Sequence, residues 1–126
     1  MITAAVHAGA GDDLSDPNVV KVVLSKDGAA LYFSRSLIPH SASEPPPKRY
    51  RHKGIYGYSK DFLLQFVRWQ PSSLETAERL EQLRALENGA TIHVVVTADD
   101  SIGVDTPDQA RQVEQLMLAN LPNTAT

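Results

Sequence analysis

The sequence of 126 residues contains no cysteine, and its net charge is only −3. The lack of cysteine excludes disulfides, thiolate nucleophiles and cysteine-bound metals, and it favours a reducing compartment, with the cytoplasm as the expected location. Binding to a phosphate backbone requires a surplus of lysine and arginine, so we expect no nucleic-acid partner. No apolar run approaches the length of a membrane span, and residues 1–18 lack the basic region and apolar core of a signal peptide. We therefore expect no membrane association.

Familiar catalytic motifs are missing as well. The sequence has no glycine-rich phosphate loop, no His-x-x-x-His or His-Glu-x-x-His metal spacing and no Gly-x-Ser-x-Gly elbow. The composition, with 42% hydrophobic and 21% charged residues, is that of a globular chain and not of a disordered one. The length suffices for one core and is too short for two, so we expect residues 1–126 to form a single domain.

Alternating strand and helix patterns predict an α/β fold. Strands are expected at residues 1–8, 19–24, 29–34, 51–58 and 91–97, the last of them buried on both faces apart from His93. Asp27-Gly28 predicts a hairpin turn between the second and third strands, because glycine adopts positive φ freely. Residues 39–47 hold four of the eight prolines and predict an irregular loop. We expect a mixed β-sheet with flanking helices.

Three helices are predicted from their capping residues and apolar spacing. The first begins after Ser59 and carries Phe62, Leu63, Phe66 and Val67 on one face. The second opens with a capping box, Ser72 and Glu75, and continues to Asn88-Gly89 with an apolar stripe of Leu74, Ala77, Leu80, Leu83 and Leu86. The third opens with Thr106-Pro107 and Gln109 and ends near Asn120.

The stretch from Arg51 to Tyr58 has an unusual face. In a strand, side-chain alternation places His52, Gly54, Tyr56 and Tyr58 on the same side. A glycine inside a strand often marks close approach by a ligand or by another backbone. Two interpretations remain open: a partly exposed edge strand with aromatic cross-strand pairs, or the floor of a pocket for a small polar ligand.

Several polar residues also allow two interpretations. Asp105 precedes a capped helix, where it either stabilises the helix N-terminus or binds a metal. Arg35 follows a predicted strand and forms either a surface salt bridge or a bidentate clamp for a carboxylate. Glu78, Glu81 and Gln82 lie beside the apolar stripe of the second helix, which usually indicates a solvated flank.

Short segments of the sequence match those of a known enzyme family, in the same order. They are DPNVVKVV at 16–23, ALYFSR at 30–35, IP at 38–39, HKGIY at 52–56, LEQLR at 80–84 and GVDTP at 103–107. The sequence therefore resembles 3-deoxy-manno-octulosonate cytidylyltransferase, also called CMP-Kdo synthetase. The resemblance implies a cytoplasmic, homodimeric transferase of lipopolysaccharide biosynthesis that joins CTP and the sugar acid Kdo into CMP-Kdo and releases diphosphate.

The resemblance also implies roles for single residues. It implies that the sugar acid contacts Arg35, His52, Tyr56, Glu81 and Gln82, and that the carboxylate of Asp105 binds Mg²⁺. No residue is implied as a covalent nucleophile, because nucleotidyl transfer relies on positioning and charge neutralisation.

The resemblance covers only the C-terminal part of this Rossmann-like nucleotidyltransferase fold. The family's N-terminal half, with its nucleotide loop and another metal-binding aspartate, has no counterpart in the sequence. We therefore expect the sugar-acid-binding and dimerisation half of the enzyme, inactive when alone. One alternative is a non-catalytic sugar-acid-binding or dimerisation module derived from that enzyme. A further alternative is a cytidylyltransferase that acts on a related sugar acid. Lys53 departs from the family motif, but strand alternation directs it away from the predicted pocket.

Overall fold

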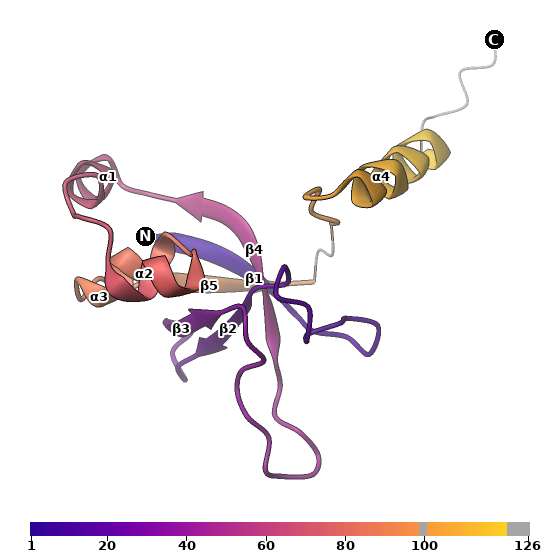
Figure 1. Cartoon of the computed structure of the whole chain (residues 1–126), viewed down its shortest axis with the longest axis horizontal. Helices are drawn as coiled ribbons and strands as arrows, with labels where there is room; N and C mark the ends of the chain where they lie inside the picture. The colour runs from indigo at the N-terminus through magenta and orange to yellow at the C-terminus, as the bar shows by residue number, and fades with distance from the viewer. Residues whose placement is uncertain (99–100, 121–126) are drawn as a thin grey trace.

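The computed structural model describes residues 1–98 and 101–120. Its strands are β1 (Ile2–His7), β2 (Lys21–Leu24), β3 (Ala30–Ser34), β4 (Tyr50–Gly57) and β5 (His93–Thr97). Its helices are α1 (Lys60–Phe66), α2 (Ser73–Glu78), α3 (Gln82–Glu87) and α4 (Pro107–Asn120). Helices α1, α2 and α3 gather on one side of the view in Figure 1, whereas α4 lies apart from them on the other side.

The five strands form one mixed sheet in the order β3-β2-β4-β1-β5. β1 runs parallel to β5, and the other neighbouring strands are antiparallel. The prediction of an α/β fold with a mixed sheet and helices is confirmed. The hairpin prediction is confirmed too, because Gly28 has a φ of 85° and the Ser25 amide donates to the carbonyl of Ala29 at 2.8 Å.

The core lies between the sheet and the helices α1 and α3. Its fully buried apolar side chains include Phe33 from β3, Leu83 from α3 and Ile92 just before β5. Phe66 of α1 belongs to the same cluster. Burial of about 25 cal/mol per Å² of apolar surface makes such a layer the main stabilising contribution. The polar residues described below are fixed around this layer.

The second predicted helix is divided into two in the structure, so the prediction of one continuous helix was wrong. Arg79 separates α2 from α3 in a left-handed conformation with a φ of 54°. The break follows Glu78, whose carboxylate accepts hydrogen bonds from β3. The break also divides the apolar stripe, since Leu80 and Leu83 are buried whereas Leu74 is 40% exposed. A tertiary contact therefore overrides the helical pattern.

Two other expectations about burial were wrong. β5 is not buried on both faces, because it is an edge strand of the described sheet and the side chains of Val95 and Val96 are exposed. The face predicted for α1 is only partly buried: Phe66 reaches the core, but Leu63 and Val67 are exposed. The apolar pattern identified both elements correctly but not the surface that each one covers.

α4 begins with the predicted capping box. The Gln109 amide donates to Oγ1 of Thr106 at 3.2 Å, and the Thr106 amide donates to Oε1 of Gln109 at 3.0 Å. No residue of α4 is buried. Within the described residues, no helix has both the length and the apolar character that crossing a membrane requires.

Candidate functional site

β4 contains the polar and aromatic face that the sequence predicted, but its backbone is not regular. In the pairing with β1, Thr3 lies opposite Tyr56 and Ala4 lies opposite Lys53, so Gly54 and Ile55 form a bulge. His52 and Tyr56 stay on one face, with their ring centroids 5.5 Å apart. Bulges are common near functional sites because they redirect side chains.

The imidazole of His52 is enclosed by three neighbours. The Phe33 ring meets it edge-on with the centroids 4.9 Å apart, the Tyr56 ring lies on another side, and Oγ1 of Thr3 is 2.8 Å from Nε2. Burial lowers the pKa of His52 to about 4, because the charged imidazolium is poorly solvated there. His52 is therefore neutral at pH 7 and can act as a hydrogen-bond donor and acceptor.

The phenol groups of Tyr56, in β4, and of Tyr58, just after it, lie near Glu81 at the start of α3. Burial raises the pKa of the Tyr56 hydroxyl, and the nearby Tyr58 and the carboxylate of Glu81 raise it further. Burial and Glu81 also raise the pKa of Tyr58. Tyr56 is therefore a protonated donor at neutral pH, and within the described residues its hydroxyl has no hydrogen-bond partner. The arrangement brings a donor from β4 near an acceptor at the N-terminus of α3.

Gln82, in the first turn of α3, is only 4% exposed, so the expectation of a solvated flank was wrong for this residue. Its amide Nε2 is buried and finds no hydrogen-bond partner in the described part of the chain. A buried polar group without a partner costs about 1–3 kcal/mol, so it is an uncommon feature that suits a ligand-binding position. Glu81 beside it is exposed, as a solvated flank predicts.

Arg35 lies at the end of β3, where backbone carbonyls hold its guanidinium. Nε donates to the carbonyl of Glu78 at 2.8 Å, Nη1 to that of Pro17 at 2.9 Å and Nη2 to that of Arg79 at 3.3 Å. An arginine has five N–H donors, so two remain for other acceptors. The structure thus brings Arg35 to the α2–α3 break and not directly beside His52.

Two further residues fix this region, and sequence reasoning gave them no role. Nζ of the fully buried Lys21 donates to the carbonyls of Asp16, Val19 and Arg35 at 3.2, 2.5 and 2.5 Å.

The Glu78 carboxylate accepts from the hydroxyls of Ser34 at 2.6 Å and Tyr32 at 3.3 Å and from the backbone amide of Arg35 at 2.9 Å. Glu78 is therefore not part of a solvated flank. The sequence did carry one signal, the lysine that interrupts the apolar run of β2.

Asp105 is not in contact with this cluster but lines a cavity of about 500 Å³ that His52 also lines. The residues around this cavity include Asp12, Arg51, His52, Asp105 and Gln109. Within residues 1–98 and 101–120, no group of three or more His, Cys, Asp and Glu side chains could hold a metal ion. Asp12 is already engaged by Arg51 at 3.3 Å, and Oε1 of Gln109 accepts two backbone amides. Asp105 therefore offers one carboxylate, which suits a magnesium site completed by water and substrate oxygens.

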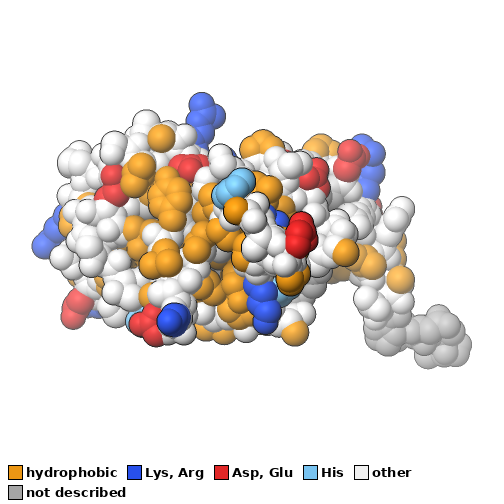
Figure 2. All heavy atoms as spheres, turned by 90° about the horizontal axis from the view of Figure 1, so that it is seen from below, with side chains coloured by type: hydrophobic (Ala, Val, Ile, Leu, Met, Phe, Trp, Pro, Cys, Tyr) orange, Lys and Arg blue, Asp and Glu red, His pale blue; other side chains and the backbone are white. Residues whose placement is uncertain are grey.

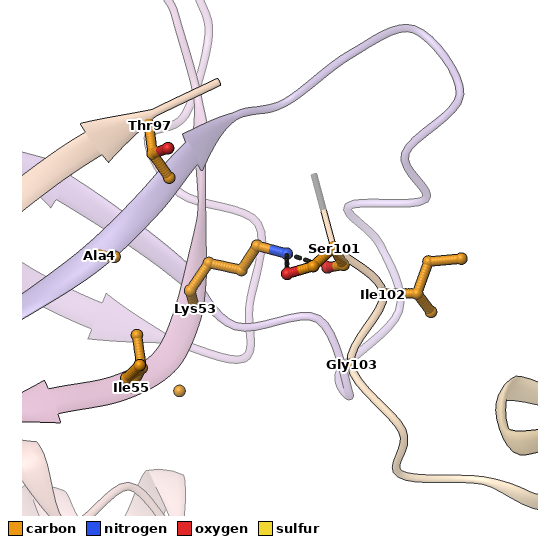
Figure 3. Close-up of a pocket in the computed structure, with 8 residues that line it drawn as sticks. Ala4, Lys53, Ile55, Thr97, Ser101, Ile102 and Gly103 are labelled. Atoms are coloured by element: carbon orange, nitrogen blue, oxygen red, sulfur yellow. Dashed lines mark hydrogen bonds between the residues drawn. The ribbon is translucent and has the colours of Figure 1, made fainter. Parts of the chain in front are cut away.

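A second pocket of about 350 Å³ adjoins this cavity (Figure 3). The side chain of Lys53 extends across it, and its Nζ donates to the carbonyl of Ser101 and lies 3.4 Å from Oγ of the same residue. Lys53 thus links β4 to the segment that carries Asp105. The sequence predicted that the Lys53 side chain points away from the face of His52 and Tyr56, and its contact with Ser101 agrees with that prediction.

The mixed open sheet and its helices define an α/β fold of the nucleotidyltransferase type. Residues 1–92 match a family model described as Cytidylyltransferase, and the chain belongs to this family.

The relatives of the chain carry a more specific name. Proteins named 3-deoxy-manno-octulosonate cytidylyltransferase from Pelobacter propionicus and Geobacter sulfurreducens are 52% and 49% identical to it, over 76% and 80% of this chain. The matches cover 42% and 45% of these relatives. A solved structure of CMP:2-keto-3-deoxy-manno-octonic acid synthetase complexed with CTP aligns with a TM-score of 0.88 and 37% identity, over 95% of this chain and 49% of that one. The family resemblance found in the sequence is confirmed, and the chain spans less than half of each relative's length.

Proposed function

We propose that the chain is the sugar-acid-binding part of a 3-deoxy-manno-octulosonate cytidylyltransferase. The complete enzyme would transfer CMP from CTP to Kdo, giving CMP-Kdo and diphosphate for lipopolysaccharide biosynthesis. The observation that carries the proposal is the buried, unpartnered amide of Gln82, which follows Glu81, the carboxylate that acts on the unpartnered phenol of Tyr56. Buried donors of this kind fit a polyhydroxylated ligand, which offers many acceptors and donors in a small volume.

Each residue has a role that follows from its chemistry. Tyr56 and the Gln82 amide donate to sugar oxygens, the carboxylate of Glu81 accepts from sugar hydroxyls, and neutral His52 does either. The two remaining N–H groups of Arg35 bind the carboxylate of the sugar acid, because the guanidinium matches a carboxylate in geometry and charge. A single domain, residues 1–126, would supply these contacts.

The reaction joins the anomeric hydroxyl oxygen of Kdo to the α-phosphorus of CTP. The bond between this phosphorus and the diphosphate oxygen breaks, diphosphate leaves, and the hydroxyl proton passes to solvent. The chain contributes orientation of the sugar acid and no covalent nucleophile. Asp105 would hold a magnesium ion, which supplies charge neutralisation for the phosphates when bound. The chain alone has no counterpart for more than half of its relatives' length, so we propose that it is inactive without the remainder.

We also propose a cytoplasmic homodimer. The lack of cysteine supports a reducing compartment. Exposed apolar side chains support self-association, and they occur on β3, β4, α1 and β5. Figure 2 shows hydrophobic side chains gathered across one face of the molecule. Light scattering of the purified chain would show twice the mass of 13.8 kDa, and a monomer at micromolar concentration would contradict the proposal.

A diphosphate-release assay tests the catalytic proposal. CTP, Kdo and magnesium are supplied to this chain alone and to this chain mixed with the separately made N-terminal half of a close relative. We expect release only in the mixture, and its loss when Tyr56→Phe and Gln82→Leu are combined. Release by the chain alone would contradict the proposal that the chain is inactive without the remainder of the enzyme. No release in either case, from a folded chain that binds Kdo, would favour the non-catalytic module, and faster release with another sugar acid would reassign the substrate.

A further inference from the structure

The bulge in β4 is held by one hydroxyl of β1. Thr3 is 3% exposed and lies where the register between β1 and β4 shifts. Its Oγ1 lies 2.7 Å from the carbonyl oxygen of Ile55, 3.3 Å from that of Lys53 and 2.8 Å from Nε2 of His52. One buried oxygen therefore contacts both the bulged backbone and the imidazole.

The single proton of this hydroxyl decides the direction of each hydrogen bond. A carbonyl oxygen only accepts, so the contact of 2.7 Å with the carbonyl of Ile55 requires the proton of Thr3. Without that proton, two lone pairs would face each other at this distance. The Thr3 oxygen is then left as an acceptor toward His52. Nε2 of His52 must therefore carry a proton and donate it to Thr3.

The tautomer of His52 follows from this assignment. Since burial keeps the ring neutral at pH 7, it holds one proton, which lies on Nε2. Nδ1 then has a free lone pair, and in the described part of the chain no hydrogen bond reaches it. Nδ1 is not among the fully enclosed polar atoms without a partner, so it remains accessible. The ring thus offers an acceptor in a fixed orientation.

We propose that Thr3 is a positioning residue that fixes the Nε2–H tautomer and the orientation of His52, so that Nδ1 accepts a hydrogen bond from a hydroxyl group of the sugar acid. This inference rests on the proposed function for the identity of the ligand. The proton on Nε2 is assigned from the contacts of Thr3, and the free lone pair on Nδ1 follows because the buried ring is neutral.

Nitrogen-15 NMR of the histidine side chains in the purified chain at pH 7 tests the proton assignment. We expect protonated Nε2 and unprotonated Nδ1 for His52, with an Nε2 proton that exchanges slowly with water. Thr3→Val keeps the shape of the side chain but removes the acceptor, so the slow proton is expected to disappear. Thr3→Ser restores the hydroxyl and the slow proton. Thr76→Val, which removes an exposed hydroxyl from α2, is the matched control and leaves the His52 signals unchanged.

Titration with Kdo tests the consequence for binding. Thr3→Val is expected to raise the dissociation constant for Kdo about tenfold, the effect of one lost hydrogen bond, while Thr3→Ser stays within about threefold. A protonated Nδ1 in the unaltered chain, or equal Kdo affinity in Thr3→Val, overturns the inference. If the unaltered chain does not bind Kdo, the proposed function fails together with the ligand assignment for Nδ1. The proton signal of His52 still decides whether Thr3 fixes the ring.

Discussion

Residues 1–98 and residues 101–120 are held by different kinds of contact. In the first region, buried side chains connect neighbouring elements, as Lys21 does for β2, the loop before it and the end of β3. In the second region, α4 has no buried residue and lies apart from the other helices (Figure 1). The proposed sugar-acid contacts all lie in the first region, whereas Asp105 lies in the second. The division suggests that recognition of the sugar acid depends on this chain and that the metal site depends on additional protein.

The two regions also differ in their ion pairs. Arg84 Nη2 lies 2.5 Å from Oε1 of Glu75, with the side chains 15% and 11% exposed, and its guanidinium covers the ring of Phe66. Arg111 and Asp108 of α4 lie 3.1 Å apart, with the side chains 73% and 90% exposed. Solvent screens the second pair far more than the first. Equivalent substitutions in the two regions should therefore have unequal effects.

The largest difference between the two regions is expected when one cationic side chain is removed from each and the free energy of unfolding is compared. Lys21→Met keeps the aliphatic volume but leaves the carbonyls of Val19 and Arg35 without their donor, so we expect the free energy of unfolding to fall by about 3 kcal/mol. Arg111→Met is the control in α4 and should change it by less than about 0.5 kcal/mol. Urea denaturation followed by tryptophan fluorescence measures both. Equal effects of the two substitutions would remove the distinction between the regions.

A pair of carboxylate substitutions should show the same difference with a dependence on pH. The hydrogen bond from Arg84 lowers the pKa of Glu75, so the folded chain binds a proton there less readily than the unfolded chain. The pair therefore stabilises the fold at neutral pH, and this contribution is lost as the pH falls through the lowered pKa. Glu75→Gln should cost about 2 kcal/mol at pH 7 and less in acid.

Denaturation curves at pH 7 and in acid measure this effect. Asp108→Asn is the matched control, because its exposed pair contributes less than about 0.5 kcal/mol at either pH. A constant cost of Glu75→Gln at all pH values would show that the ion pair with Arg84 is not its cause.

Substitutions of glycine by alanine should give a smaller difference in stability between the two regions. A Cβ added to Gly57 would lie 2.6 Å from Cγ2 of Ile2, whereas one added to Gly54 would meet nothing within 4 Å. Gly57→Ala is therefore expected to destabilise the chain by about 1 kcal/mol, since the Ile2 side chain must shift. Gly54→Ala in the same strand and Gly103→Ala in the second region should be near neutral. Thermal unfolding of the three variants measures the order, and a larger loss for Gly54→Ala would contradict the packing of the bulge.

The glycines also illustrate what the sequence could predict. Alternation correctly placed His52 and Tyr56 on one face, and Asp27-Gly28 and the Thr106 capping box were predicted because their signals are local. A Cβ added at Gly54 would meet open space, and the close approach in this strand occurs at Gly57 instead. No local pattern indicates where the register between two distant strands shifts. The roles of the side chains around that shift were therefore invisible.

The same reason explains the errors in the helices and in β5. The division between α2 and α3 depends on the contact of Glu78 with Ser34, which is 44 residues away in the chain. The exposure of Val95 depends on whether another element packs over that face of β5, which no local pattern indicates. The roles of Glu81 and Gln82 came from the family resemblance alone. The buried amide of Gln82 is the feature that the structure adds in support of that role.

The smallest effect is expected for magnesium. Asp105 supplies one carboxylate, and in the described part of the chain no cluster of three potential ligands exists. We therefore expect the chain alone to bind the ion weakly, so that millimolar magnesium stabilises it by less than about 0.1 kcal/mol, the value for a concentration well below the dissociation constant. Asp105→Asn should leave this value and the Kdo affinity unchanged. A clear stabilisation by magnesium that disappears in Asp105→Asn would show that the second region forms its metal site unaided. Additional protein would then be needed only for binding of the nucleotide.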